Sequence, residues 1–71
     1  MNAESLRKWR KSERLSQTLF AKLFGVGPAT AWRWEHGKVR IPYYVWILVY
    51  CIEQGFLDID ELDELQKELR Q

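Results

Sequence analysis

Apolar residues recur at helical spacing along most of the chain, whereas the alternation of apolar and polar residues that marks a β-strand is almost absent. The pattern predicts a first helix over about residues 3–13, in which Leu6 and Trp9 face inward. A second helix is predicted from the N-cap Ser16 to near Gly25, which permits the left-handed conformation that ends many helices. Its apolar face is expected to consist of Leu19, Phe20 and Leu23.

A third helix is predicted from Pro28 to about Glu35, after a short turn. Proline suits the first helical position because an N–H group there would have no partner within the helix. Gly37 is expected to end this helix, and a short basic loop over residues 38–41 follows.

A fourth helix, YYVWILVYCIEQ, is predicted to start at Pro42 and to end at Gly55. It is apolar nearly all round, so we expect it to be buried on more than one side. A fifth helix, DIDELDELQKELRQ, is predicted with Asp58 or Asp60 as its N-cap. These elements predict an all-α fold of five helices, forming one domain over residues 1–71, with a C-terminal helical segment at 56–71 for dimerisation or docking.

The net charge of +1 conceals an uneven distribution along the chain. Residues 1–40 carry nine Lys and Arg against three Glu, a balance of +6, whereas residues 53–71 carry two basic against seven acidic residues, a balance of −5. A basic first half suits a polyanion such as nucleic acid, and an acidic end would be repelled from it. The alternative is that these charges only solvate helix surfaces.

Length and cysteine content restrict the class of protein further. A chain of 71 residues can form one small core, and the single cysteine, Cys51, can form neither a disulfide framework nor a multi-cysteine metal site. The opening MNAESLRKWRK has no apolar run suited to a secretory signal, and IPYYVWILVYCI is shorter than the ~20 residues that span a bilayer. We therefore expect a soluble, cytoplasmic protein with no membrane partner.

Two short helices joined by a tight turn with glycine form a helix-turn-helix, a unit that can place its second helix in the DNA major groove. The run LRKWRKSERLSQTLFAKLFGVGPATAWRWEHGKVRIP resembles the lambda-repressor-like, XRE/Cro-type helix-turn-helix family, over roughly residues 5–54. The resemblance rests on LSQ at the start of the second helix, LFAKLFGV after it, and Trp-Glu-x-Gly-Lys at the end of the third. It implies a five-helix DNA-binding domain.

The resemblance also implies roles for three polar residues. Arg10 and Glu35 match a largely buried ion pair that ties the first helix to the third. Gln17 matches a glutamine that grips the DNA backbone, and the free N–H groups at a helix start favour a phosphate independently of the resemblance. The alternative for Gln17 is a local capping role.

The third helix separates two neighbouring tryptophans, because residues two apart in a helix point in nearly opposite directions. Ala31 and Trp34 are expected in the core. The opposite side is expected to face DNA bases through Pro28, Ala29, Trp32 and Arg33. Arg33 suits guanine O6 and N7, whereas Pro28 and Ala29 offer only apolar contact with thymine methyl groups. Trp32 has two alternatives: contact with DNA, or packing that extends the core or a dimer interface.

Further residues are predicted around this helix and in the C-terminal part. Predicted phosphate contacts come from Gln17, Thr18, Lys22, Gly27, Thr30, His36, Lys38, Arg40, Tyr43 and Tyr44. A dimer interface is predicted from Trp46, Val49, Tyr50, Leu62, Leu65 and Leu69.

The sequence therefore predicts a dimeric, sequence-specific regulator of transcription that binds an inverted repeat in double-stranded DNA. The resemblance implies a repressor, often of its own promoter, of the kind found in phages and mobile elements, and extends to anti-CRISPR-associated autorepressors. With one His, one Cys, and neither a phosphate-binding loop nor a metal-ligand cluster, we expect no enzyme, cofactor, metal site or small-molecule effector. The alternative function is a protein-binding module, such as an antitoxin, whose fourth helix binds a partner protein.

Overall fold

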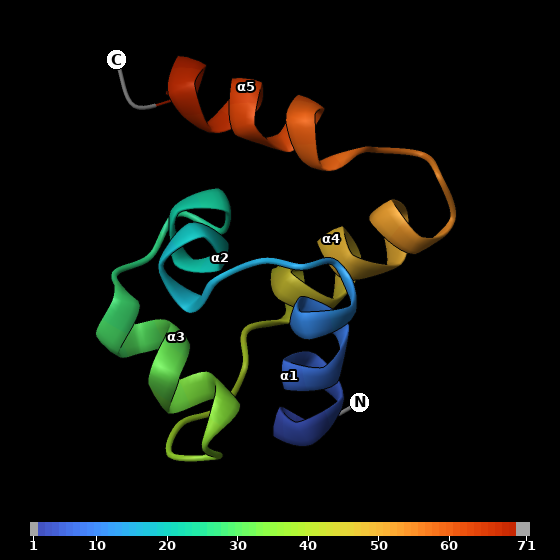
Figure 1. Ribbon diagram of the computed structural model, residues 1–71. Coiled ribbons are helices and arrows are strands. Elements are labelled where there is room, and N and C mark those ends of the chain that lie inside the picture. Colours follow the sequence, from blue (N-terminus) through green and yellow to red (C-terminus); the bar gives the residue numbers. More distant parts are fainter. Residues whose placement is uncertain (1, 70–71) are drawn as a thin grey trace. The chain divides into compact units, whose positions relative to one another are not determined.

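Residues 2–69 are described by a computed structural model (Figure 1). Within them the chain forms five α-helices and no strand: α1 (Ala3–Ser12), α2 (Gln17–Leu23), α3 (Pro28–Glu35), α4 (Tyr43–Glu53) and α5 (Ile59–Leu69). This confirms the all-α prediction for the described residues. Residues 70 and 71 of the predicted fifth helix lie outside them.

Side-chain caps explain where two of the helices begin. The Ser16 hydroxyl accepts a hydrogen bond from the N–H of Leu19 at 3.0 Å, as predicted for the start of α2. The Asn2 side chain caps α1 in the same way, accepting from the N–H of Ser5 at 2.9 Å. The Asn2 cap was not predicted from the sequence, although asparagine is among the best N-cap residues.

The first residues of α5 and α4 refine two predicted helix starts. Asp58 caps α5: its carboxylate accepts from the N–H of Glu61 at 2.7 Å, while the Glu61 carboxylate accepts from the N–H of Asp58 at 3.1 Å. This reciprocal capping box selects Asp58 over Asp60. Pro42 is the N-cap of α4 rather than its first residue.

Helices α1 to α4 each end with a residue in the left-handed region, at Arg14, Gly25, Gly37 and Gly55. After α2, the N–H of Val26 donates to the carbonyl of Ala21 at 2.9 Å, closing the last turn as in a Schellman motif. Glycine adopts this conformation without steric cost, which is why the ends of three helices could be predicted. Arg14, with φ of 58°, makes the same turn without that advantage.

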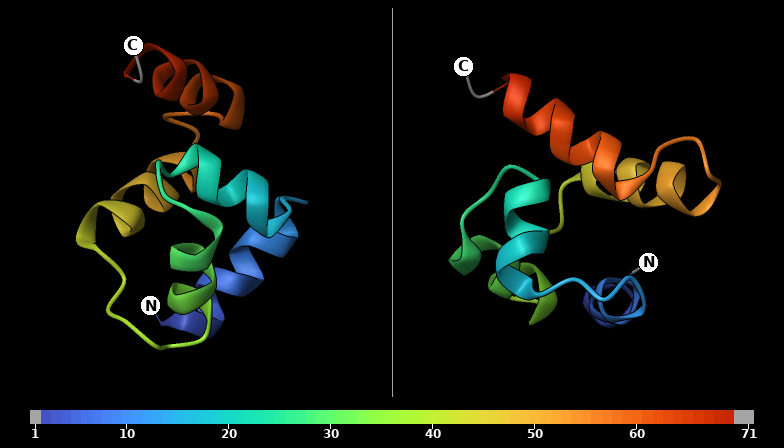
Figure 2. Two further views of the ribbon diagram at one scale, coloured as in Figure 1. Left: turned by 90° about the vertical axis from the view of Figure 1, so that its left-hand side faces the viewer. Right: turned by 45° about the horizontal axis from the view of Figure 1, so that its top comes forward.

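The chain divides into two units, one ending at Ile41 and one beginning at Pro42. In the first unit α3 packs against both α1 and α2, and α2 and α3 cross steeply (Figures 1 and 2). Phe20 lies at the centre of its core, with ring centroids 6.4 Å from Trp9, 4.6 Å from Phe24 and 6.3 Å from Trp34. The core residues of this unit are Leu6, Trp9, Leu15, Phe20, Ala21, Leu23, Phe24, Ala31 and Trp34.

One residue of the predicted apolar face of α2 is misplaced. Leu19 is 41% exposed, whereas Phe24, which the prediction did not include, is buried. The helix presents Phe20, Leu23 and Phe24 inward at i, i+3 and i+4, so Leu19 is turned out of that stripe.

The second unit contains α4 and α5, joined by a loop that Figure 2 shows from two sides. The fully buried residues of α4 are Val45 and Val49, four apart, so full burial is confined to one side of this apolar helix. Tyr50 is exposed, and its ring meets the edge of the Phe56 ring at a centroid distance of 6.4 Å. Trp46, Leu48, Cys51 and Ile52 flank these two residues and are partly buried, so the expected burial of α4 on more than one side is only partial within the single chain.

Candidate nucleic-acid interface

The turn between α2 and α3 sets the start of the predicted recognition helix. The chain reverses at Gly25, and Gly27 then occupies the N-cap position of α3 with extended backbone and no side-chain hydrogen bond. Pro28 takes the first helical position, as predicted. A Cβ atom at Gly27 would meet nothing within 4 Å, so the backbone at the start of α3 is open to an approaching group.

One side of α3 is anchored in the core. Ala31 and Trp34 are buried, with Trp34 only 3% exposed, and its ring meets Phe20 edge-on. Both residues lie where the sequence predicts them. The third buried residue of α3 is the charged Glu35.

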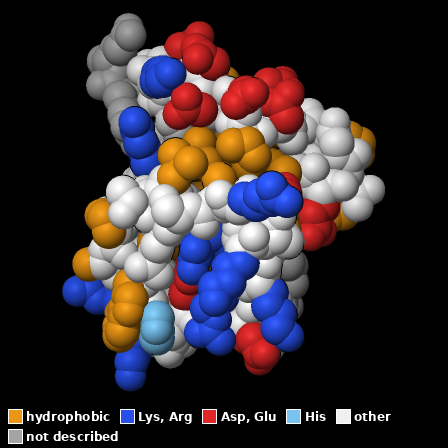
Figure 3. Space-filling view, viewed as in Figure 1, with side chains coloured by type: hydrophobic (Ala, Val, Ile, Leu, Met, Phe, Trp, Pro, Cys, Tyr) orange, Lys and Arg blue, Asp and Glu red, His pale blue; other side chains and the backbone are white. Residues whose placement is uncertain are grey.

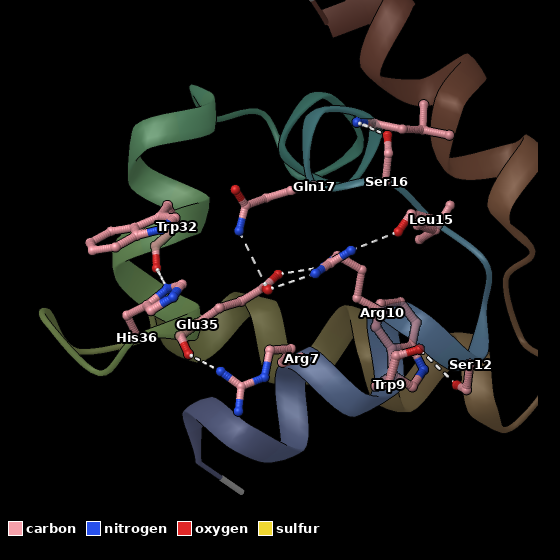
Figure 4. Close-up of polar contacts among 11 residues, drawn as sticks. Arg7, Trp9, Arg10, Ser12, Leu15, Ser16, Gln17, Trp32, Glu35 and His36 are labelled. Atoms are coloured by element: carbon pink, nitrogen blue, oxygen red, sulfur yellow. Dashed lines mark hydrogen bonds and ion pairs between the residues drawn. The ribbon is translucent and has the colours of Figure 1, made fainter.

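The carboxylate of Glu35 forms a two-pronged ion pair with the guanidinium of Arg10 from α1 (Figure 4). Arg10 Nε lies 2.7 Å from Oε2, and Nη2 lies 3.0 Å from Oε1. The side chains of Arg10 and Glu35 are 12% and 1% exposed. Arg10 Nη1 also donates to the carbonyl of Leu15 at 2.9 Å, so one arginine joins α1, α3 and the segment before α2. The predicted ion pair is confirmed.

Gln17 lies beside this pair. Its amide nitrogen points to Glu35 Oε1 at 3.5 Å, a long hydrogen bond (Figure 4). The capping of α2 is done by Ser16, so Gln17 does not have the capping role considered as the alternative. Its contact with a phosphate stays a prediction. Arg7, which the sequence analysis did not single out, similarly donates to the backbone carbonyl of Glu35 at 3.5 Å.

The opposite side of α3 is exposed along its whole length. It carries the four predicted base-contacting residues, Pro28, Ala29, Trp32 and Arg33. Trp32 is 44% exposed, so the alternative that it extends the core of this unit is not supported. The structure thus separates the two tryptophans as the helical geometry predicts.

The Trp32 ring has a partner that the sequence analysis missed. His36 stacks on it with a centroid distance of 4.0 Å and an angle of 16° between the ring planes. The His36 Nδ1 atom lies 2.8 Å from the Trp32 carbonyl oxygen (Figure 4). The i, i+4 spacing of the two rings could have indicated this contact, because residues four apart share a helix face.

The predicted phosphate-contacting residues of the first unit are near the surface. Thr18, Lys22, His36, Lys38 and Arg40 are exposed, while Gln17 and Thr30 are partly buried. Lys38 and Arg40 follow α3 directly, beyond the turn at Gly37. Lys and Arg side chains are prominent on this unit in Figure 3, whereas acidic side chains dominate α5.

Tyr43 and Tyr44 begin α4 and are both exposed. Desolvation by partial burial raises the pKa of Tyr44 above its ordinary value. A tyrosine hydroxyl is protonated near neutral pH, so both side chains can donate a hydrogen bond. Because the two tyrosines belong to the second unit, their part in one interface with α3 stays a prediction.

The predicted dimer residues fall into two groups. Val49 and Leu62 are buried in the single chain, whereas Tyr50, Leu65 and Leu69 are exposed and Trp46 is partly buried. Buried side chains have no surface to offer a second copy, so Val49 and Leu62 are structural residues of the single chain. An interface through the others stays a prediction.

Between residues 2 and 69, no group of three or more His, Cys, Asp or Glu side chains is placed to hold a metal ion. No helix in the same range is long and apolar enough to cross a membrane. In comparisons with known proteins, no family model, curated protein or solved structure matches the chain.

Proposed function

We propose that this protein is a sequence-specific DNA-binding regulator of transcription, with a lambda-repressor-like helix-turn-helix formed by α2 and α3. The observation that carries the proposal is the two-sided character of α3. Its inner side is fixed by Trp34 and by the Glu35–Arg10 ion pair, while its outer side presents Trp32 and Arg33. A helix held rigidly on one side and exposed on the other is what readout of base edges requires.

The charges around α3 support the same function. Lys38 and Arg40 are exposed immediately after the helix, where they can contact phosphates that flank a base-reading helix. Arg33 on the outer side can form two hydrogen bonds with guanine O6 and N7. Phosphate contacts supply affinity and orientation, and Arg33 supplies part of the sequence preference.

The regulator is proposed to act as a symmetric dimer and as a repressor. Two recognition helices would bind an inverted repeat with half-sites about one helical turn apart. Exposed apolar residues of α4 and α5, among them Tyr50 and Leu65, are available for the dimer contact. Occupying a promoter, including its own, would then block transcription, as the resemblance to phage and anti-CRISPR-associated autorepressors implies.

Selection from a pool of random DNA duplexes tests this function. We expect recovery of one palindromic sequence, bound more tightly than random duplex by the factor of about 10³ or more that separates specific from non-specific binding. The affinity should fall steeply as salt is raised, because each phosphate contact releases counterions. Recovery of no common sequence, or binding insensitive to salt, would overturn the proposal.

A second function is favoured by the exposed rings of α4 and the loop after it. Tyr43, Tyr50 and Phe56 are all strongly exposed, and a large apolar surface of this kind often marks a protein interface. The chain would then be a protein-binding module, such as an antitoxin. A chain that sediments as a monomer at micromolar concentration and selects no DNA sequence would favour this function over the regulator.

A further inference from the structure

The outer side of α3 carries a stacked pair of aromatic rings, Trp32 and His36. Trp32 and His36 stack at 4.0 Å, and two groups of His36 meet the Trp32 carbonyl oxygen: the backbone N–H at 3.0 Å and the ring Nδ1 at 2.8 Å. A carbonyl oxygen can only accept a hydrogen bond, so Nδ1 carries the proton and donates. The imidazole is thus held by its backbone, by its hydrogen bond and by the stacked ring.

The stack also restrains the tryptophan. An exposed indole can adopt several rotamers, and fixing one of them on binding costs conformational entropy. With His36 against one ring face, Trp32 has a preferred position while 44% of its surface stays accessible. Figure 4 shows the indole directed away from the Arg10–Glu35 pair, outward from the body of the first unit.

The neighbours of Trp32 determine what such a surface can read. Pro28 and Ala29 precede it by one turn on the same side of α3, and both are exposed. Neither side chain has a hydrogen-bond donor or acceptor. In the major groove, the apolar feature of a base edge is the C5-methyl group of thymine.

We propose that the Trp32 indole is an apolar plate that reads a thymine methyl group, and that His36 positions it by stacking on one ring face. The inference rests on the proposed DNA-binding function and specifies the base feature that α3 recognises. It also changes the role of His36, which the sequence analysis placed among the phosphate contacts. Its ring stacks on Trp32 and its Nδ1 atom bonds the Trp32 carbonyl oxygen at the end of α3, so a phosphate contact is not needed to explain its geometry.

Replacing thymine by deoxyuridine tests the proposal, because it removes the methyl group and leaves every hydrogen-bonding group of the base pair intact. The probe is the duplex recovered by the selection described above, with each thymine replaced in turn. At one position per half-site we expect wild-type affinity to fall about 3- to 5-fold, as for the loss of one buried methyl group. Trp32→Ala should bind the thymine and uridine duplexes equally.

Two His36 variants separate positioning from phosphate contact. His36→Phe has an aromatic ring and no charge, whereas His36→Lys has a cation and no ring. Positioning predicts that the Phe variant retains the uridine penalty and the Lys variant loses it. Phosphate contact predicts instead that the Lys variant retains wild-type affinity while the Phe variant lowers the salt dependence by about one counterion.

Lys38→Gln is the matched control, since it removes a neighbouring charge without touching the stack. It should weaken binding to thymine and uridine duplexes equally. Circular dichroism confirms that each variant is folded, and the ring-current shift of the residue 36 ring protons in the Phe variant reports the stack without DNA.

The outcomes distinguish failure of this inference from failure of the proposed function. A chain that selects no duplex overturns both. A selected duplex that tolerates uridine at every position, or an equal uridine penalty in wild type and Trp32→Ala, overturns the apolar plate alone. An unchanged penalty in His36→Lys overturns the positioning role of His36.

Discussion

The two sides of α3 differ in burial, although their residues are neighbours in the sequence. The inner side buries Trp34 and Glu35, and the outer side exposes Trp32 and Arg33, so a large ring and a charge occur on each. Residue type therefore does not tell the two sides apart. What differs is the set of partners: Trp34 and Glu35 contact residues of α2 and α1, whereas the Trp32 ring stacks on His36, directly after its own helix.

Replacing each tryptophan by alanine is the strongest test of this difference. Trp34→Ala removes a buried ring that packs on Phe20 and should lower the free energy of unfolding by about 4 to 5 kcal/mol. Trp32→Ala removes a partly exposed ring and should cost about 1 kcal/mol or less. Urea denaturation measures both values. Equal losses for the two variants would show that the sides of α3 are not as different as the structure indicates.

The buried ion pair is the next largest contribution. Glu35→Ala leaves the guanidinium of Arg10 without its carboxylate, at a cost of about 3 to 4 kcal/mol in the free energy of unfolding. We expect the lower part of the usual range because Arg10 keeps its bond to the Leu15 carbonyl and is 12% exposed, which lets water reach it. Urea denaturation again gives the value.

A double variant separates the contribution of the ion pair to the free energy of unfolding from the penalty of a buried, unpaired charge. Arg10→Met with Glu35→Leu replaces both charged groups by apolar side chains of similar size. It should be more stable than Glu35→Ala alone, because no charge remains buried without a partner. This account would be contradicted if the double variant lost as much stability as Arg10→Met and Glu35→Leu lose together when each is made alone.

The features that sequence reasoning predicted are those with a local cause. Ser16 caps α2, Pro28 starts α3 and Gly37 ends it because the required backbone conformation depends on a few neighbouring residues. The placement of Trp32 and Trp34 on opposite sides of α3 followed from helical periodicity. The Arg10–Glu35 pair spans 25 positions, and it was predicted only through the family resemblance.

The features that were not predicted depend on the packing of helices or on which of several local conformations a residue adopts. Leu19 was expected on the apolar face and is exposed, while Phe24 was not included and is buried; both are apolar, and the packing of neighbouring helices decides which is covered. Arg14 ends α1 in a conformation that its residue type does not signal. The side chain of His36 folds back on its own helix instead of extending, and the i, i+4 rule would have indicated that contact had it been applied to rings.

Arg33 tests the outer side without disturbing the inner one. Arg33→Ala should reduce discrimination at one guanine by about 1 to 3 kcal/mol, because the paired hydrogen bonds to O6 and N7 are lost. Arg33→Lys keeps the charge but not the two-pronged geometry, so it should retain the salt dependence and lose most of the discrimination. Competition between the selected duplex and single-base variants measures this. Unchanged preference in Arg33→Ala would remove Arg33 from the base-reading surface.

The smallest expected effects come from the cations that follow α3. Lys38→Gln and Arg40→Gln should each weaken binding to all sequences alike, because a phosphate contact carries no base information. Each loss should reduce the slope of log affinity against log salt concentration by about 0.9. Glu13→Gln, at an exposed residue beyond the end of α1, is a control for a change of charge away from α3. If the Lys38 variant instead altered base preference, its side chain would contact bases together with Arg33. The base-contacting surface would then extend beyond Gly37, and Lys38 would not be a phosphate contact.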